Sequence, residues 1–175
     1  TGGTPQAYTS VLFSDLNRCL IGYENTSSRS VNIVYGDIDK GFPNPFSFNP
    51  VNQLYQAPVG NTITMVRFIE EGFNTLIQKP RGLCIYAETG VGASVGTYIQ
   101  AYEFDFITNT IVLGEKTQIN VAGIEADAVF VDEDNFAIYT ADNTLEYWGV
   151  NWSDTGTPFP LTKENEEQVS GLTSV

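Results

Sequence analysis

The stretch AVFVDEDNFAIYTADNTLEYWGV, residues 128–150, consists of three short apolar runs that are separated by two polar turns. The runs are rich in β-branched and aromatic residues and are too short for helices, which is typical of β-strands. Asp and Asn suit the two turns because they tolerate a left-handed backbone and bond to their own main chain. The stretch therefore predicts three consecutive antiparallel strands joined by tight turns.

The same alternation of apolar runs and turn residues continues along the whole 175-residue chain. The runs are bounded by Gly, Asn, Asp or Pro, as strands require and long helices do not. We therefore expect an all-β protein. The expected strands are residues 8–13, 19–24, 30–35, 62–69, 74–78, 82–87, 97–107, 110–113, 118–121, 126–131, 136–140 and 144–150.

Three copies of this pattern can be laid over one another, at about residues 8–59, 62–113 and 118–152. In each copy a phenylalanine ends the first strand, an acidic residue follows two positions later, and an aromatic residue marks the third strand. These positions hold Phe13, Phe68 and Phe130, then Asp15, Glu70 and Asp132, then Tyr35, Tyr86 and Trp148. The segment NQLYQAPV, residues 52–59, supplies a candidate fourth strand at a sheet edge.

Two segments, YIQAYEFDFITNTIVLGEKT at residues 98–117 and ADAVFVDEDNFAIYTADNTLEYWGV at residues 126–150, resemble consecutive blades of a β-propeller. The resemblance implies antiparallel four-stranded meanders in which an outer strand leads into the inner strand of the next blade. Propellers have about four to eight blades, whereas this chain offers three such units. The resemblance therefore implies a fragment, or blades that associate from several chains. A β-sandwich or jelly roll and a β-trefoil remain alternative folds.

The charge balance excludes several classes of partner. The chain carries 21 acidic and 8 basic residues, a net charge of -13, and its basic residues are scattered. Phosphate backbones are bound by clustered basic residues, so nucleic acid is not an expected partner. No apolar run approaches the roughly 18 residues of a membrane helix, so we do not expect membrane insertion.

Histidine is absent from the chain, and its two cysteines are Cys19 and Cys84. This composition excludes Ser-His-Asp and Cys-His nucleophiles and every zinc site that uses imidazole. The cysteines lack the CxxC spacing of a redox motif, and we expect small buried side chains, with a single disulfide as the alternative. We therefore assign no catalytic residue and do not expect an enzyme.

Carboxylates at corresponding turns of the three units are the candidate metal ligands. Asp15, Glu70 and Asp132 occupy matching places, and Asp134 adds a carboxylate to the turn DEDN at residues 132–135. Oxygen-rich turns are what Ca²⁺ uses in proteins, although the EF-hand spacing is absent here. Calcium is therefore the one cofactor that the sequence suggests.

Aromatic residues near position 150 are the candidate ligand-binding residues. Tyr147, Trp148 and Trp152 have side chains of the kind that stack on sugar faces. They predict, as an alternative function, a carbohydrate-binding, lectin-like domain. The acid pair Glu103 and Asp105 raises a third alternative, a carboxylate-dependent enzyme that acts on glycans.

The C-terminal residues differ in character from the rest, so we expect one domain over residues 1–160 and a short polar tail over residues 161–175. In the tail, Thr162 suits a helix N-cap, the segment KENEEQV permits a helix, and Gly171 could end it. The tail therefore predicts one or two helical turns.

Together these features predict a non-enzymatic structural or adhesive module of a larger assembly, such as a virion, a phage appendage or a cell-surface protein. The expected partners are protein subunits, in a homo-oligomer or a larger assembly, and glycans are further candidate ligands. The corresponding location is extracellular or on a virion surface.

Overall fold

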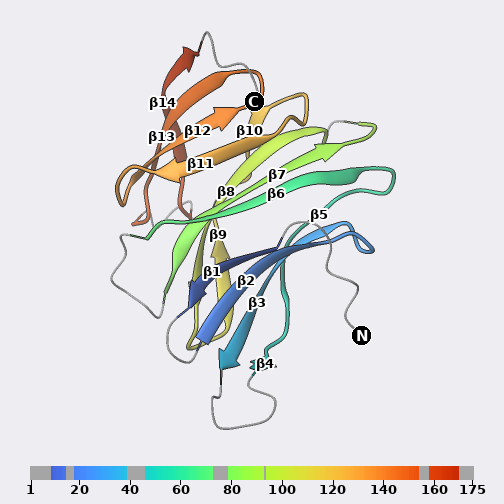
Figure 1. Ribbon diagram of the computed structural model, residues 1–175, viewed down its shortest axis with the longest axis vertical. Coiled ribbons are helices and arrows are strands. Elements are labelled where there is room, and N and C mark those ends of the chain that lie inside the picture. The colour runs from blue at the N-terminus through green and yellow to red at the C-terminus, as the bar shows by residue number, and fades with distance from the viewer. Residues whose placement is uncertain are drawn as a thin grey trace.

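The computed structural model describes residues 9–14, 18–38, 46–72, 79–92, 94–153 and 158–169. Every regular element in these ranges is a β-strand, and the strands form three antiparallel sheets (Figure 1). This confirms the all-β prediction. The described residues contain no helix with the length and apolar character needed to cross a membrane.

The first sheet is a meander whose outer strand is broken in two. Its strands are β1 (Thr9–Ser14), β2 (Arg18–Asn25), β3 (Ser30–Ile38), β4 (Phe46–Phe48) and β5 (Asn52–Gln56). Both β4 and β5 pair with β3, since Phe48 lies opposite Gly36 and Tyr55 lies opposite Val31. The two short strands therefore act as one interrupted fourth strand, and β5 confirms the strand expected within residues 52–59.

The second sheet repeats this plan. Its strands are β6 (Thr62–Glu70), β7 (Arg81–Thr89), β8 (Gly96–Asp105), β9 (Thr110–Leu113) and β10 (Thr117–Asn120). Strands β9 and β10 both pair with β8, at opposite ends of it, and again form an interrupted outer strand.

The third sheet contains β11 (Ala126–Phe130), β12 (Asn135–Thr140), β13 (Thr144–Val150) and β14 (Leu161–Gln168), paired in that order. The predicted helical turn in the C-terminal tail is wrong, because Leu161–Gln168 is a strand that pairs along β13 from Val150 to Thr144. Main-chain bonding to a neighbouring strand outweighs the local helix preference of Lys and Glu, as tertiary context commonly does.

Most expected strands lie within three residues of the observed ones, and the expected strand at 74–78 lies outside the described residues. One detail of the predicted repeat is wrong. Tyr86 lies on β7, the second strand of its sheet, whereas Tyr35 and Trp148 lie on the third strands β3 and β13. The equal spacing from Phe68 to Tyr86 and from Phe130 to Trp148 therefore does not reflect equivalent positions.

The second sheet is packed between the other two. Strand β7 is buried along nearly its whole length, and successive side chains point to opposite faces. Leu83, Ile85 and Ala87 belong to the hydrophobic core shared with the third sheet. Cys84 and Tyr86 belong to the core shared with the first sheet. A continuous apolar run on β7 is thus explained by burial on both faces.

The first and second sheets are in close contact at Gly22 on β2. A Cβ atom at this position would lie 2.5 Å from ring carbons of Phe68, on β6. The Phe68 ring in turn meets the Tyr102 ring edge-on, with 6.3 Å between the ring centroids. The absence of a side chain at Gly22 therefore lets the two sheets pack together.

Both cysteines are buried free thiols, Cys19 on β2 and Cys84 on β7. Burial raises the pKa of each thiol, so neither is activated as a nucleophile at neutral pH. They behave as the small buried side chains that the sequence predicted, and the alternative disulfide is not formed.

Candidate functional site

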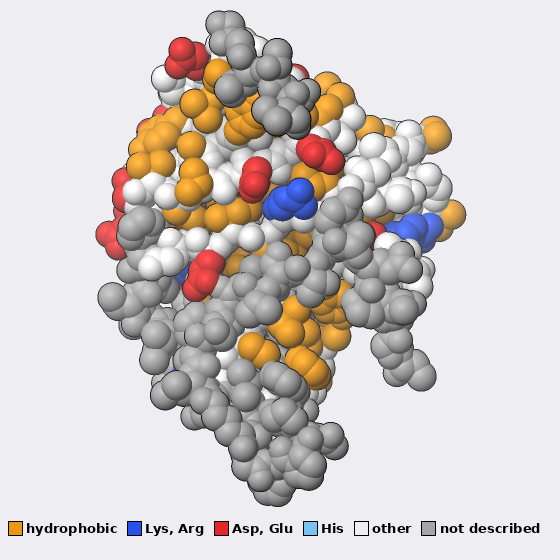
Figure 2. Space-filling view, in the orientation of Figure 1, with side chains coloured by type: hydrophobic (Ala, Val, Ile, Leu, Met, Phe, Trp, Pro, Cys, Tyr) orange, Lys and Arg blue, Asp and Glu red, His pale blue; other side chains and the backbone are white. Residues whose placement is uncertain are grey.

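The outer face of the third sheet carries apolar side chains that no described element covers. Phe136, Ile138 and Trp148 pack toward the second sheet, so the alternating residues point to the opposite face. That face holds an apolar strip of Val129, Val131, Ala137, Tyr139 and Leu145. Figure 2 shows hydrophobic side chains gathered over the region of the third sheet, with acidic side chains around them.

The apolar strip is exposed enough to act as a contact surface. Val129 is 62% exposed, Val131 is 52% exposed and Leu145 is 38% exposed. Cross-strand pairing places Val129 opposite Ala137, and Tyr139 opposite Leu145. A shallow hollow of about 240 Å³ lies over these residues and is also lined by Asp127. Contiguous exposed apolar surface of this kind marks interaction sites.

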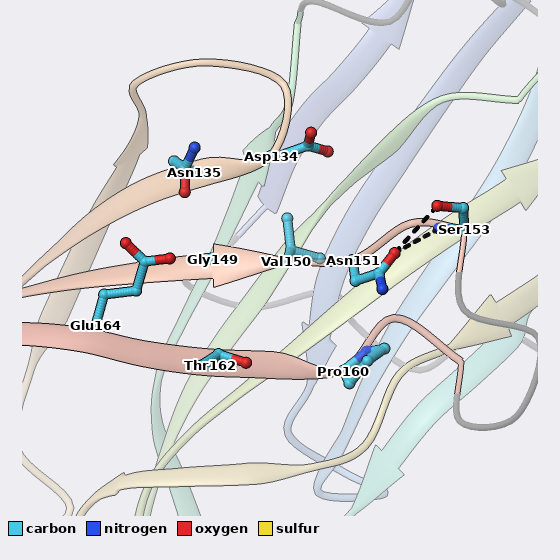
Figure 3. Close-up of a pocket in the computed structure, with 9 residues that line it drawn as sticks. All are labelled: Asp134, Asn135, Gly149, Val150, Asn151, Ser153, Pro160, Thr162 and Glu164. Carbon is cyan, nitrogen blue, oxygen red and sulfur yellow. Dashed lines mark hydrogen bonds between the residues drawn. The ribbon is translucent and has the colours of Figure 1, made fainter.

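A polar pocket of about 380 Å³ lies at the end of the same sheet (Figure 3). It is lined by Asp134, Asn135, Gly149, Val150, Asn151, Ser153, Pro160, Thr162 and Glu164. Gly149 leaves room for the pocket, since a Cβ atom there would lie 3.1 Å from Glu164 Oε1 and 3.6 Å from Asn135 Oδ1. The pocket thus depends on a strand residue without a side chain.

The polar pocket carries unbalanced negative charge. Neither Asp134 nor Glu164 forms a side-chain hydrogen bond or an ion pair within the described part of the chain, and no lysine or arginine lines the pocket. The nearest lysine in sequence, Lys163, is engaged elsewhere. Its ammonium contacts Glu146 Oε1 at 2.5 Å and also contacts Glu166. Burial lowers the pKa of Lys163, but its bonds to these two carboxylates outweigh that effect and raise it.

The predicted calcium ligands are only partly brought together. Asp132 and Asp134 share the turn between β11 and β12, where Asp132 Oδ1 accepts the Asp134 N–H at 2.9 Å. That bond, together with bonds from Asn135, lowers the pKa of Asp132. Glu70 ends β6 in the second sheet, where burial and the nearby charge of Glu71 raise its pKa.

Asp15, the remaining predicted calcium ligand, lies outside the described residues. Within the ranges that the structure describes, no group of three or more acidic or cysteine side chains could hold a metal ion. Calcium binding therefore stays a prediction.

The predicted glycan-stacking residues lie mostly in the core. Trp148 is 5% exposed, stacks on Phe136 with 6.5 Å between ring centroids, and donates from Nε1 to Glu146 Oε2 at 2.8 Å. Trp152 is 9% exposed and donates from Nε1 to the Glu133 carbonyl at 2.7 Å. Tyr147 is half-buried on the outer face. Neither indole offers a free face to a sugar ring.

The acid pair Glu103 and Asp105 is neutralised by neighbouring cations. Glu103 Oε2 accepts from Arg81 Nε at 3.0 Å, and Lys79 Nζ lies 3.5 Å from Glu103 and 3.7 Å from Asp105. The main-chain N–H of Ile107 lowers the pKa of Asp105, with Thr108 and Lys79 adding to the effect. A general acid needs a raised pKa, and the lowered pKa of Asp105 does not suit it to that role.

A buried polar cluster joins the first two sheets, and sequence reasoning missed it. Glu88, at 0% exposure, ends the apolar run of β7. Its Oε1 accepts from Asn61 Nδ2 at 2.5 Å and from Ser94 Oγ at 2.9 Å, and its Oε2 accepts from the Tyr55 hydroxyl. Burial, followed by this bond to Glu88, raises the pKa of Tyr55. The one sequence signal is an acid at the end of a long apolar run.

One cation packs against the outside of this cluster. The Lys116 ammonium covers it from outside, 4.0 Å from the Tyr98 ring centroid and 4.7 Å from the Tyr55 ring centroid. Asn61 Oδ1 accepts the Val91 N–H at 3.0 Å and so anchors the glycine-rich connection between β7 and β8. The cluster therefore fixes a loop and a contact between sheets.

Comparison with known proteins gives no family. No protein-family model matches this chain, and no curated protein matches it. Among solved structures, Hsv2p of Kluyveromyces lactis matches 94% of this chain over 75% of its own, with 11% identity and a TM-score of 0.30. Hsv2 of Kluyveromyces marxianus matches 94% over 74%, with 10% identity and a TM-score of 0.27. TM-scores this low carry no argument about function.

Proposed function

We propose that this chain is a non-enzymatic structural module that assembles by packing another β-sheet on the outer face of its third sheet. The observation that carries the proposal is the apolar strip. The second sheet is covered on both faces by its neighbours. No described element covers the outer face of the third sheet, which bears Val129, Val131 and Leu145 in exposed positions.

We infer that the covering sheet belongs to a second copy of the chain. The first sheet also has an outer face, on which Ile21 and Val34 lie opposite each other and are half-buried. Head-to-tail packing of that face on the apolar strip would join three sheets from each copy into six. A propeller has about four to eight blades, so a ring of six such sheets could close.

The proposed setting is the surface of a virion, a phage appendage or a cell. A net charge of -13 would keep such a module soluble while its apolar faces are packed against neighbouring copies. Glycan binding is the weaker candidate function, because Trp148 and Trp152 are buried and Tyr147 is the one predicted sugar contact that keeps some exposure.

The mass of the native assembly tests the proposal, measured by light scattering after size exclusion. We expect a mass above 19.2 kDa for the chain. The double variant Val129→Lys/Leu145→Lys should return the mass to that of the monomer. The matched control Val91→Lys/Val121→Lys adds the same charge at valines that are 89% and 77% exposed outside the third sheet, and should keep the assembly.

Two results would contradict the proposed assembly. One is a monomeric mass for the unaltered chain at all concentrations. The other is an equal loss of assembly in the strip variant and in the control, because a general charge effect would then explain it.

A further inference from the structure

Two tyrosine rings, one from each of the first two sheets, hold the ammonium group of Lys116. Tyr55 lies on β5 of the first sheet, and Tyr98 lies on β8 of the second sheet. The Lys116 Nζ atom lies 4.7 Å from the Tyr55 ring centroid and 4.0 Å from the Tyr98 ring centroid. A ring face attracts a cation within about 6 Å of its centroid. We call the rings of Tyr55 and Tyr98 the aromatic cage, since together they bind a cation.

A buried carboxylate strengthens the attraction of the aromatic cage for a cation. Glu88 is 0% exposed, accepts a hydrogen bond from the Tyr55 hydroxyl, and forms no ion pair among the described residues. Its negative charge acts more strongly in the protein interior than it would in water. Tyr86 stacks on Tyr55, with 4.7 Å between the ring centroids, and so holds the Tyr55 ring in place. The aromatic cage is therefore preorganised for a positive charge.

Lys116 is placed so that its side chain can leave the aromatic cage. It is an exposed residue on the short link between β9 and β10. Within the described ranges it forms no ion pair, so the two ring faces are what bind its ammonium group there. A primary ammonium group is strongly hydrated and regains water when it moves out. Methylated ammonium groups are the cations that aromatic cages commonly recognise, so such a group suits the same place.

The charge around the aromatic cage favours a lysine-derived ligand over a phosphocholine head group. The chain carries a net charge of -13, Glu115 is exposed beside Lys116, and Glu88 is buried behind the Tyr55 ring. A phosphate group would be repelled by this charge, whereas a basic segment of a partner protein would be attracted.

We propose that the aromatic cage binds a methylated lysine side chain of a partner protein, and that Lys116 closes the site when this ligand is absent. The incoming cation must displace a tethered lysine, which competes at a high effective concentration. This site goes beyond the proposed assembly, because it lies between the first two sheets and does not use the apolar strip.

Proton NMR tests the proposal with the amide of N-acetyl-trimethyllysine as the probe, because ring currents shift its methyl resonance upfield on binding. The Lys116→Ala variant should bind the probe about tenfold more tightly than the unaltered chain, since the tethered competitor is gone. Lys116→Ala/Tyr55→Leu also removes one ring and should bind about five- to thirtyfold more weakly than Lys116→Ala. The control Lys79→Ala removes a lysine that contacts Glu103 and Asp105 instead of rings, and it should bind like the unaltered chain.

Two further probes separate the charge of the ligand from its shape and its source. A neutral analogue, in which a tert-butyl group replaces the trimethylammonium group, should bind Lys116→Ala at least about fivefold more weakly. This comparison does not depend on the folding of the Tyr55→Leu variant. Phosphocholine should also bind more weakly than the trimethyllysine probe.

Four results would overturn the proposal. They are no binding to Lys116→Ala, equal binding to Lys116→Ala and the unaltered chain, equal affinity for the neutral analogue, and tighter binding of phosphocholine than of the lysine probe. Light scattering should give Lys116→Ala the same mass as the unaltered chain, so failure of the aromatic cage and failure of the assembly are distinguishable.

Discussion

Replacing Glu88 with alanine should destabilise the chain by about 3 to 5 kcal/mol. The side chain is fully buried and accepts hydrogen bonds from Tyr55, Asn61 and Ser94. A buried donor that loses its acceptor costs about 1 to 3 kcal/mol. Asn61 is buried and would lose the most, whereas Tyr55 and Ser94 are half-buried and can recover part of the loss by bonding to water.

Urea unfolding measures this loss as a decrease in the free energy of unfolding. The slope of that free energy against urea concentration should stay the same in both proteins. Glu88→Gln keeps the shape and one acceptor oxygen, so it should lose about 1 to 2 kcal/mol. The control Glu125→Ala removes an exposed acid and should change stability by less than about 0.5 kcal/mol. A loss below about 1 kcal/mol for Glu88→Ala would refute the view that the cluster holds the first two sheets together.

Three further predictions concern packing and pH. Gly22→Ala should lower the free energy of unfolding in urea by about 1 to 3 kcal/mol, because the added Cβ would lie 2.5 Å from the Phe68 ring. An unchanged urea concentration at the unfolding midpoint would contradict this close packing. Ile85→Ala on β7 should cost about 2 to 5 kcal/mol and lower the Tm in calorimetry, whereas the exposed Val121→Ala should change it little. The raised pKa of Tyr55 means that the folded state holds the hydroxyl proton more tightly than the unfolded state does. The stability that this proton contributes is therefore complete below pH about 10, and it is lost as the pH rises above that value. Unfolding free energies measured from pH 8 to pH 11 should therefore fall less steeply in Tyr55→Phe, and identical slopes would contradict the assignment.

Strand positions could be predicted from the sequence because the signals are local. Apolar runs end at turn residues that tolerate unusual backbone, and Asn109 and Asn143 indeed adopt positive φ angles at two of the expected turns. The strand β14 could not be predicted in this way. Its residues favour a helix locally, and only pairing with β13 makes them extended.

The sites were harder to predict because they depend on contacts between distant segments. Alternation shows that Tyr147 and Trp148 point to opposite faces, but not that the second sheet covers the Trp148 face. The Glu88 cluster joins Tyr55, Asn61 and Ser94, which come from different strands and loops. No sequence pattern fixes such a set before the sheets are packed.

The burial of β7 on both faces has a consequence for cooperativity. Leu83 and Ile85 face one neighbouring sheet while Cys84 and Tyr86 face the other, so loss of either neighbour exposes half of this strand. We therefore expect opening of one sheet to weaken the attachment of the other, so that the three sheets unfold together. The amide protons of β7 should be among the last to exchange with deuterium, since their exchange requires opening of the whole chain.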